Sequence, residues 1–281
     1  MIGLCVDSNS QLPPSLAERF GMVVAPISVT VDGVDYLEGV DITAAEFYTA
    51  WDDGQTPTIS TSQPSPGQFV TAYQQLVDAG ATEILSIHVA EAMSGTLNSA
   101  RVAAQSAKVP VTLVDSGTAS FGISCCAWAA ADAVAAGAPI DEAARIAGAR
   151  SSALGSSFIV GIPQLAERSG RAVGAGVEAA ASEGIPVLSM AGSDIAVLDT
   201  VTTVDAAVSA MADYALGWTS SSPDGLRVAI GTSDVSSGVV GAALTEALSG
   251  HSALAEAPVQ YTIGPSVGAH TGPGTAGLFV F

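Results

Sequence analysis

The chain has 281 residues, of which 48% are hydrophobic and 12% are charged, and its formal net charge is -19. This composition is that of a folded protein with a large core, which excludes an intrinsically disordered chain. A surface this acidic repels nucleic acid and anionic lipid, so we expect no nucleic-acid partner and no stable membrane insertion.

Short apolar runs alternate with helical patterns along the chain. Strands are predicted over residues 1–6, 22–31, 83–89, 109–116, 156–162, 184–190, 226–232, 259–264 and 276–281. Helices are predicted over residues 65–79, 95–107, 119–136 and 141–152. Ser65 suits the N-cap of the first helix, and Pro66 suits its first position. This alternation favours an α/β fold in which helices cover sheets.

A domain boundary is predicted at "SSALGSS", residues 151–157, where a helix ends in small polar residues. We therefore expect two α/β domains, residues 1–152 and 153–281, each with a sheet flanked by helices. The Ser-rich residues 217–225 are expected to form a loop in the second domain. Residues 31–48 are also interpreted as a loop and, from their position alone, as a candidate lid.

The longest uncharged apolar segment, residues 117–131, is short for a membrane span, so we interpret it as a buried helix. The chain starts in a strand-like segment without a basic region, so no signal peptide is expected. Cys5, Cys125 and Cys126 have the spacing of neither a disulfide framework nor a zinc site. These features favour a cytoplasmic protein.

Motifs of common enzyme classes are incomplete. The stretch "GPSVG", residues 264–268, matches a nucleophile elbow, but we expect no helix directly after Ser266, and no acidic residue follows it. "GAGVEA", from Gly174, lacks the leading strand of a dinucleotide site, and Lys108 lacks the glycines of a phosphate-binding loop. No cluster has metal-ligand spacing. We expect no autonomous catalysis, no cofactor and no metal; a nucleophilic Ser94 or Ser266 is the competing hypothesis.

Two hydroxyl-rich stretches precede predicted helices. "TISTSQPSPG" contains Thr61 and Ser62, and "SIHVAEAMSGTLNSA" places Ser94, Gly95 and Thr96 at a predicted helix N-terminus. Backbone N–H groups and hydroxyls at such a position bind anions, which indicates a carboxylate or phosphate site. Helix capping is the competing interpretation, because a cap needs only one hydroxyl.

The three histidines differ in their surroundings. His88 lies in a predicted strand and is interpreted as a core or edge residue, whereas His251 is expected in a surface loop. His270 stands among glycines that allow close approach to a ligand. Asp7–Ser8 and Asp115–Ser116 each end an apolar strand, which is either ordinary turn chemistry or the edge where α/β sheets bind ligands.

Six stretches together, in order from residue 6 to residue 280, resemble the DegV family: "VDSNSQLP", "TSQPSPGQF", "SIHVAEAMSGTLNSA", "LVDSGTASFG", "SGR" and "VGAHTGPGTAGLFVF". These are bacterial fatty-acid-binding proteins that include the lipid-carrying subunit of fatty acid kinase. The resemblance implies the EDD fold, with two α/β domains and a long-chain fatty acid in an apolar tunnel at their interface. It also implies a separate ATP-dependent kinase as partner.

The resemblance also implies which residues bind the fatty acid carboxylate: Thr61, Ser62, Ser94, Gly95, Thr96, Arg171 and His270. The helix "GISCCAWAAADAVAA", residues 122–136, is a candidate tunnel wall, and close helix–sheet packing explains its small residues equally well.

The second half departs from the family pattern. Ser169 replaces the first glycine of a Gly-Gly-Arg motif, and no lysine or arginine occurs between Arg171 and Arg227. Relatives that serve the kinase usually carry basic residues there. The sequence therefore leaves two hypotheses, a carrier that presents its fatty acid to a kinase and a lipid-binding or sensing protein without one.

Overall fold

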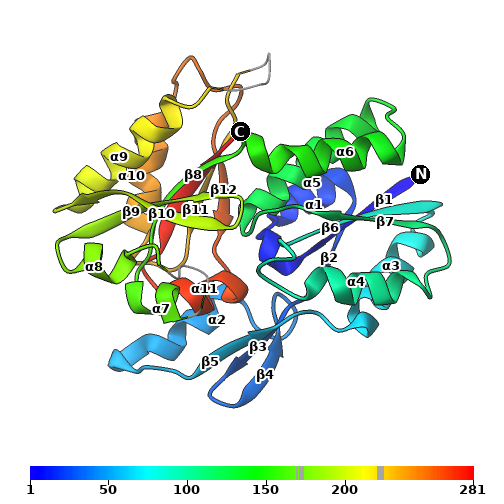
Figure 1. The fold of residues 1–281 in the computed structure, drawn as a ribbon, viewed down its shortest axis with the longest axis horizontal. Helices are drawn as coiled ribbons and strands as arrows, with labels where there is room; N and C mark the ends of the chain where they lie inside the picture. Colours follow the sequence, from blue (N-terminus) through cyan, green and yellow to red (C-terminus); the bar gives the residue numbers. More distant parts are fainter. Residues whose placement is uncertain (169, 171–173, 220–224) are drawn as a thin grey trace. The chain divides into compact units, whose positions relative to one another are not determined.

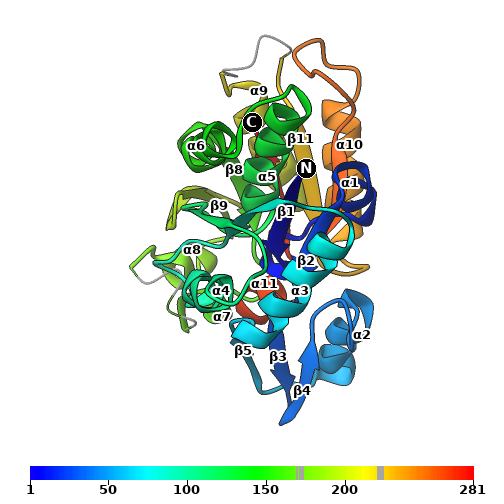
Figure 2. The same ribbon diagram turned by 90° about the vertical axis from the view of Figure 1, so that its right-hand side faces the viewer.

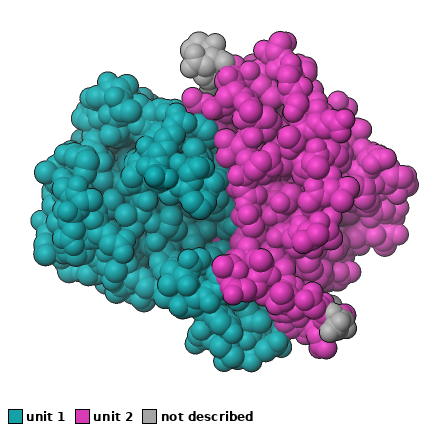
Figure 3. All heavy atoms as spheres, turned by 180° about the vertical axis from the view of Figure 1, so that it is seen from behind, with its two compact units in different colours: residues 1–42, 58–152 teal, residues 43–57, 153–281 magenta. Residues whose placement is uncertain are grey.

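The computed structural model describes residues 1–168, 170, 174–219 and 225–281 (Figure 1). The chain separates into two compact units, which Figure 3 colours separately. Unit 1 comprises Met1–Ile42 and Thr58–Ser152, and unit 2 comprises Thr43–Pro57 and Ala153–Phe281. The expected linear division into 1–152 and 153–281 differs from these units in residues 43–57, which are part of unit 2.

Unit 1 contains a parallel sheet whose strands, in spatial order, are β2 (Met22–Ala25), β1 (Ile2–Asp7), β6 (Glu83–His88) and β7 (Val111–Asp115). One face is covered by α3 (Pro66–Asp78) and α4 (Thr96–Ala104), and the other by α1 (Pro14–Phe20), α5 (Phe121–Ala135) and α6 (Ile140–Arg150) (Figure 1). Because helices bury both faces, β1 and β6 are almost continuously buried.

Local signals set the helix starts in unit 1. The Ser65 hydroxyl accepts a hydrogen bond from the Gln68 N–H at 3.3 Å, and the Gln68 side chain accepts one from the Ser65 N–H. This capping box, with Pro66 at the first position, confirms the predicted start of α3. The predicted start of α4 beside Ser94 is also confirmed.

The expectation of one strand over residues 22–31 was wrong. Pro26 interrupts the run, and because proline has no N–H to donate to a sheet, the chain leaves the parallel sheet after β2. The following residues form β3 (Ser28–Val31), which pairs with β4 (Val34–Leu37) and β5 (Ile59–Ser62) in a separate antiparallel sheet. Figures 1 and 2 show this small sheet at one end of unit 1.

The expectation of a loop over residues 31–48 was also wrong. Asp32 and Gly33 have φ angles of 49° and 82°, and two positive values are those of a type I′ hairpin turn. They join β3 to β4, and α2 (Ala44–Tyr48) follows with a capping box at Thr43. The Asp-Gly pair is a hairpin signal, so ordinary turn chemistry accounts for this segment.

Unit 2, in its described part, contains a mixed sheet in the order β10 (Asp194–Val201), β9 (Ile185–Ala191), β8 (Gly155–Ile159), β13 (Ala276–Val280), β11 (Val228–Thr232) and β12 (Val259–Thr262). Helices α9 (Val204–Leu216) and α10 (Gly238–Leu248) bury one apolar cluster against it. A smaller cluster lies under α7 (Pro163–Arg168) and α8 (Val177–Ala181). Sheets flanked by helices in both units confirm the predicted α/β class.

The interpretation of residues 117–131 as a buried helix is confirmed by α5, which packs beside α6 on the sheet of unit 1. No helix in the described ranges combines the length and apolarity needed to span a bilayer. Cys5, Cys125 and Cys126 are free, buried thiols, all in unit 1. Burial raises the pKa of Cys5 and of Cys126 to about 12, so neither thiol ionises near neutral pH.

Candidate functional site

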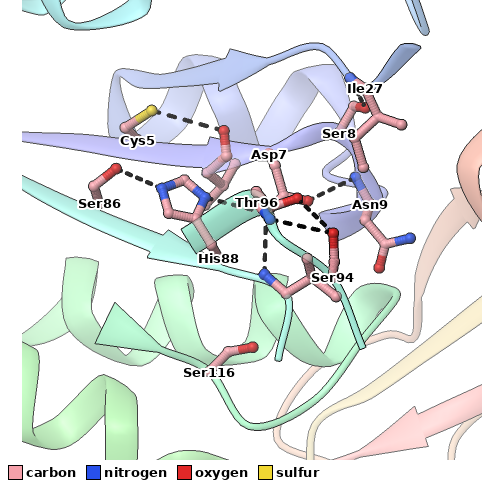
Figure 4. A network of polar contacts seen from close by, with 12 residues as sticks. Cys5, Asp7, Ser8, Asn9, Ile27, Ser86, His88, Ser94, Thr96 and Ser116 are labelled. Carbon is pink, nitrogen blue, oxygen red and sulfur yellow. Dashed lines mark hydrogen bonds and ion pairs between the residues drawn. The ribbon is translucent and has the colours of Figure 1, made fainter. Parts of the chain in front are cut away.

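Polar side chains gather where the strands of the unit 1 sheet end (Figure 4). Strands β1, β6 and β7 end at Asp7, His88 and Asp115, and the loop after β6 leads to Ser94 and the start of α4. The carboxyl edge of a parallel sheet is the usual place for a ligand in α/β proteins. Parallel pairing therefore brings the sequence motifs around residues 7, 88, 94 and 115 to one edge.

Ser94 and Thr96 form a hydroxyl pair at the N-terminus of α4. Their oxygens lie 2.8 Å apart, and the Ser94 hydroxyl also accepts a hydrogen bond from the Thr96 N–H at 3.3 Å. Gly95 is the N-cap residue and offers no side-chain oxygen, so Ser94 takes over part of the capping. Thr96 is fully buried, whereas Ser94 is half-buried and Gly95 is exposed. A single cap does not account for this second, paired hydroxyl.

Thr61 and Ser62 lie in β5, opposite Val29 and Ser28 of β3. Thr61 is half-buried and Ser62 is exposed. The next residue, Gln63, lies against the start of α4: a Cβ atom placed on Gly95 would be 3.2 Å from Gln63 Nε2.

Both hydroxyl-rich motifs therefore lie in unit 1 and adjoin each other through Gln63. Sequence reasoning did not single out this residue, although it directly follows the Thr-Ser pair.

His270 lies in the last turn of α11 (Pro265–Thr271) in unit 2 and is half-buried. The expectation of no helix after Ser266 was wrong, because α11 starts at Pro265, three residues after β12 ends. Proline at the first position suits a helix start, and the glycine content of the segment concealed this signal. Ser266 is buried, and the sequence still offers no acidic residue after it.

The turn after His270 has a backbone that requires glycine. Gly272 has φ 75° and ψ 174°, a combination available almost only to glycine, and Gly274 has φ 85°. Asp234 Oδ1 accepts a hydrogen bond from the Gly274 N–H at 2.7 Å, and Ser233 Oγ accepts one from the Thr275 N–H at 3.0 Å. The turn is therefore fixed to the loop after β11.

Asp234 is ionised at neutral pH. Partial burial opposes its charge, but hydrogen bonds from Ser236, Gly274 and Ser233 outweigh this and lower its pKa to about 2. Sequence reasoning missed Asp234, although it follows an apolar strand in the same way as Asp7 and Asp115.

Helix α11 packs against α2, which explains why residues 43–57 belong to unit 2. The Tyr48 hydroxyl donates a hydrogen bond to the Ile263 carbonyl at 2.9 Å, just before α11. Gly268 has no side chain and leaves room for Phe47 and Tyr48. Tyr48 was not a predicted site residue, because its partner lies 215 positions away in the sequence.

The remaining candidates separate clearly. His88 is a buried core histidine with partners on both ring nitrogens, which confirms the core interpretation. His251 is exposed after α10, as expected. Arg171 lies outside the described residues. Within the described ranges, no group of three or more His, Cys, Asp or Glu side chains is arranged to hold a metal ion.

Comparison with known proteins shows the family of the chain. The family model described as "Uncharacterised protein, DegV family" matches residues 1–281. A DegV domain-containing protein of Streptomyces coelicolor is 29% identical over 280 residues, covering 99% of this chain and 98% of that protein.

Two solved structures illustrate the shared fold. A DegV family protein from Thermus thermophilus, described by its fatty acid binding, aligns with a TM-score of 0.84 at 27% identity, over 100% of this chain and 99% of that one. A stearic acid-binding protein from Eubacterium ventriosum aligns with a TM-score of 0.83 at 22% identity, over 100% and 98%. The matches extend over both compact units, and the chain belongs to the DegV family.

Proposed function

We propose that this chain binds a long-chain fatty acid, with the carboxylate held by Ser94 of unit 1 and His270 of unit 2. The observation that carries the proposal is the Ser94–Thr96 hydroxyl pair at the N-terminus of α4. Hydroxyl donors at a helix N-terminus match the charge and hydrogen-bonding needs of a carboxylate. The fatty acid binding described for the Thermus thermophilus protein supports the ligand class.

The polar residues have different roles in this proposal. Ser94 is half-buried and donates its hydroxyl to the carboxylate, while the fully buried Thr96 acts through Ser94 by fixing its orientation. His270 donates a ring N–H from the end of α11. Gly95, which lies beside Gln63, and the preceding Thr61 and Ser62 complete the polar end of the site on the unit 1 side in this proposal. Arg171 would add a cation, by the family resemblance alone.

The acyl chain would supply most of the affinity. Burial of apolar surface contributes about 0.8 kcal/mol per CH2 group, so a long chain outweighs a few hydrogen bonds. The hydroxyls and His270 would then select for a carboxylate and set its orientation rather than dominate the free energy of binding. We propose that the acyl chain lies in an apolar tunnel.

Calorimetric titration of delipidated protein with oleate tests the proposal. Ser94→Ala is expected to weaken binding about tenfold, because a hydrogen bond to a charged group contributes about 1.5 kcal/mol or more. Ser106→Ala is the matched control, since Ser106 is exposed just beyond the other end of α4. His270→Ala is expected to behave like Ser94→Ala, with the exposed His251→Ala as its control. Equal affinity in each pair would contradict the head-group assignment.

We further propose that the bound fatty acid is presented to a separate ATP-dependent kinase. The purified chain with fatty acid and ATP should form no acyl phosphate. Addition of a fatty acid kinase subunit should lead to acyl phosphate formation. The lack of lysine and arginine between Arg171 and Arg227 favours the alternative, a lipid-binding or sensing protein with no kinase partner. No acyl phosphate with any kinase subunit tested, despite fatty acid binding, would support that alternative.

A further inference from the structure

A buried chain of hydrogen bonds joins α3, β6 and β1 in unit 1, and Figure 4 shows its part from Ser86 through His88 to Asp7. The Tyr73 hydroxyl lies 3.0 Å from Ser86 Oγ, which lies 2.6 Å from His88 Nε2. His88 Nδ1 lies 3.1 Å from Asp7 Oδ2. Ser86, His88 and Asp7 are fully buried. The contacts between Ser86, His88 and Asp7 are those of a hydrolytic triad, but burial closes Ser86 to any substrate, so this chain of contacts serves another purpose.

The direction of this hydrogen-bond chain follows from its ends. Asp7 is flanked by donors only: its Oδ2 also accepts the Val89 N–H at 3.0 Å, and its Oδ1 accepts the Asn9 N–H at 3.0 Å. His88 therefore donates from Nδ1 to Asp7, and in the tautomer with its single proton on Nδ1 it accepts from Ser86 at Nε2. Ser86 in turn accepts from Tyr73, whose pKa is raised by burial, so that it keeps its proton.

Asp7, at the acceptor end of this hydrogen-bond chain, binds the loop that carries Ser94. Val89, whose N–H is bound by Asp7, is the first residue after β6. The carbonyl of the next residue, Ala90, accepts hydrogen bonds from the N–H of Met93 at 2.9 Å and of Ser94 at 3.1 Å. Hydrogen bonds, together with the backbone between Val89 and Ala90, therefore connect His88 through Asp7 to the backbone of Ser94.

The second Asp-Ser pair of the sequence acts on the same loop. Asp115 Oδ1 accepts the Glu91 N–H at 3.3 Å and the Gly117 N–H at 2.9 Å. The two strands that flank β6 thus each end in an aspartate that binds one N–H of the loop after β6. The two differ in burial: Asp7 is fully buried, whereas Asp115 is exposed and water replaces its contacts at little cost.

We propose that Asp7, oriented by His88, is the positioning residue that fixes the Ser94 loop for ligand binding. The inference rests on the proposed function for its ligand readout, but the placement of the loop is testable without ligand. Asp115 plays the same part weakly. The aspartate of each Asp-Ser pair thus acts through the backbone of the neighbouring loop rather than by touching the ligand.

The first test compares Asp7→Asn with Asp115→Asn. A side-chain amide has one acceptor oxygen and one NH2 group. In Asp7→Asn, the NH2 group therefore faces the N–H of either Val89 or Asn9, and that hydrogen bond is lost. Oleate binding is expected to weaken about tenfold or more in Asp7→Asn and by less than about threefold in Asp115→Asn. Equal effects would overturn the proposal.

A second pair of variants keeps the test decisive if Asp7→Asn does not fold. The amide of His88→Asn falls near the position of Nδ1 and keeps a donor to Asp7, whereas the amide of His88→Gln falls near Nε2 and loses it. Both substitutions introduce an uncharged amide, so the two variants differ only in where the amide lies. Oleate affinity is expected to stay higher in His88→Asn than in His88→Gln, and the reverse order would overturn the proposal.

Ligand-free hydrogen–deuterium exchange separates this inference from the proposed function. Asp7→Asn is expected to speed exchange at residues 89–96 at least tenfold, while β8 and β13 of unit 2 keep their wild-type rates. The ¹⁵N shifts of His88 should show a proton on Nδ1. Wild-type protein that binds no fatty acid would refute only the proposed function. Unchanged exchange at residues 89–96, or an Nδ1 without a proton, would refute the positioning role of Asp7 and His88.

Discussion

The two segments proposed to bind the carboxylate are held in different ways. The Ser94 loop of unit 1 depends on side chains, because Asp7 and His88 bind its backbone from a fully buried position. The His270 turn of unit 2 is held by Asp234 and Ser233 and depends in addition on backbone stereochemistry, because Gly272 and Gly274 have positive φ angles that favour glycine. Substitution of Gly272 beside His270 should therefore lower the free energy of unfolding much more than substitution of Gly95 beside Ser94.

Gly272→Ala is expected to have the largest effect on stability. A Cβ atom there would lie 2.6 Å from Ile162 Cγ1, and the backbone conformation itself is unfavourable for alanine. Strain and overpacking together should lower the free energy of unfolding by about 3 kcal/mol. Urea denaturation measures this, with Gly250→Ala as control, since Gly250 has φ 71° but open space around it, and a cost of about 1 kcal/mol is expected. Equal costs would show that packing against Ile162 does not matter.

Asp234→Asn should weaken the His270 turn by removing a charged acceptor. The folded state lowers the pKa of Asp234 from 3.8 to about 2, so the carboxylate stabilises the fold above about pH 4, and this contribution is lost as the pH falls towards 2. Because Asp234 is partly exposed, we expect only about 1 kcal/mol. Acid unfolding of wild type and variant measures it, and identical curves between pH 4 and 2 would contradict this role.

Gly95→Ala tests the stability cost of a glycine substitution in the Ser94 loop of unit 1. Gly95 has φ -74°, which alanine adopts freely, and the nearest atom to an added Cβ belongs to the flexible Gln63 side chain. A loss of less than about 1 kcal/mol is expected, mostly from the poorer N-cap. A cost equal to that of Gly272→Ala would remove the proposed contrast between the two motifs.

Thiol labelling of the cysteines in the native protein is expected to show the smallest effect. Burial raises the pKa of Cys5 and Cys126 to about 12 and that of Cys125 well above its usual value. Thiol labelling at pH 8 is expected to modify none of them in the native protein and all of them in denaturant. Rapid labelling of native protein would show that the core of unit 1 opens more readily than its burial implies.

The sequence predicted those features that local chemistry sets. Ser65 and Pro66 identified the start of α3, and the "SGT" motif identified the start of α4, because caps act within a few residues. The alternation of strands and helices predicted the α/β class, because each apolar pattern is also contained within a short stretch of sequence. The Asp32–Gly33 turn was equally local, but the long apolar run before it dominated the interpretation.

Contacts between distant residues account for what could not be predicted. The Tyr48 hydroxyl binds a carbonyl 215 residues away, and His88 binds Asp7 across 81 residues. No spacing in the sequence indicates either pair. The short helix α11, rich in glycine and polar residues, has little intrinsic helix propensity and is stabilised by packing against α2.

Mass spectrometry of the purified protein, first native and then after organic extraction, shows directly whether the chain carries a fatty acid. We expect one long-chain fatty acid per chain, and a lower occupancy in Ser94→Ala than in Ser106→Ala purified in the same way. A protein that is empty and also takes up no added fatty acid would contradict the claim. The hydroxyl pair at α4 would then serve another ligand or the helix alone.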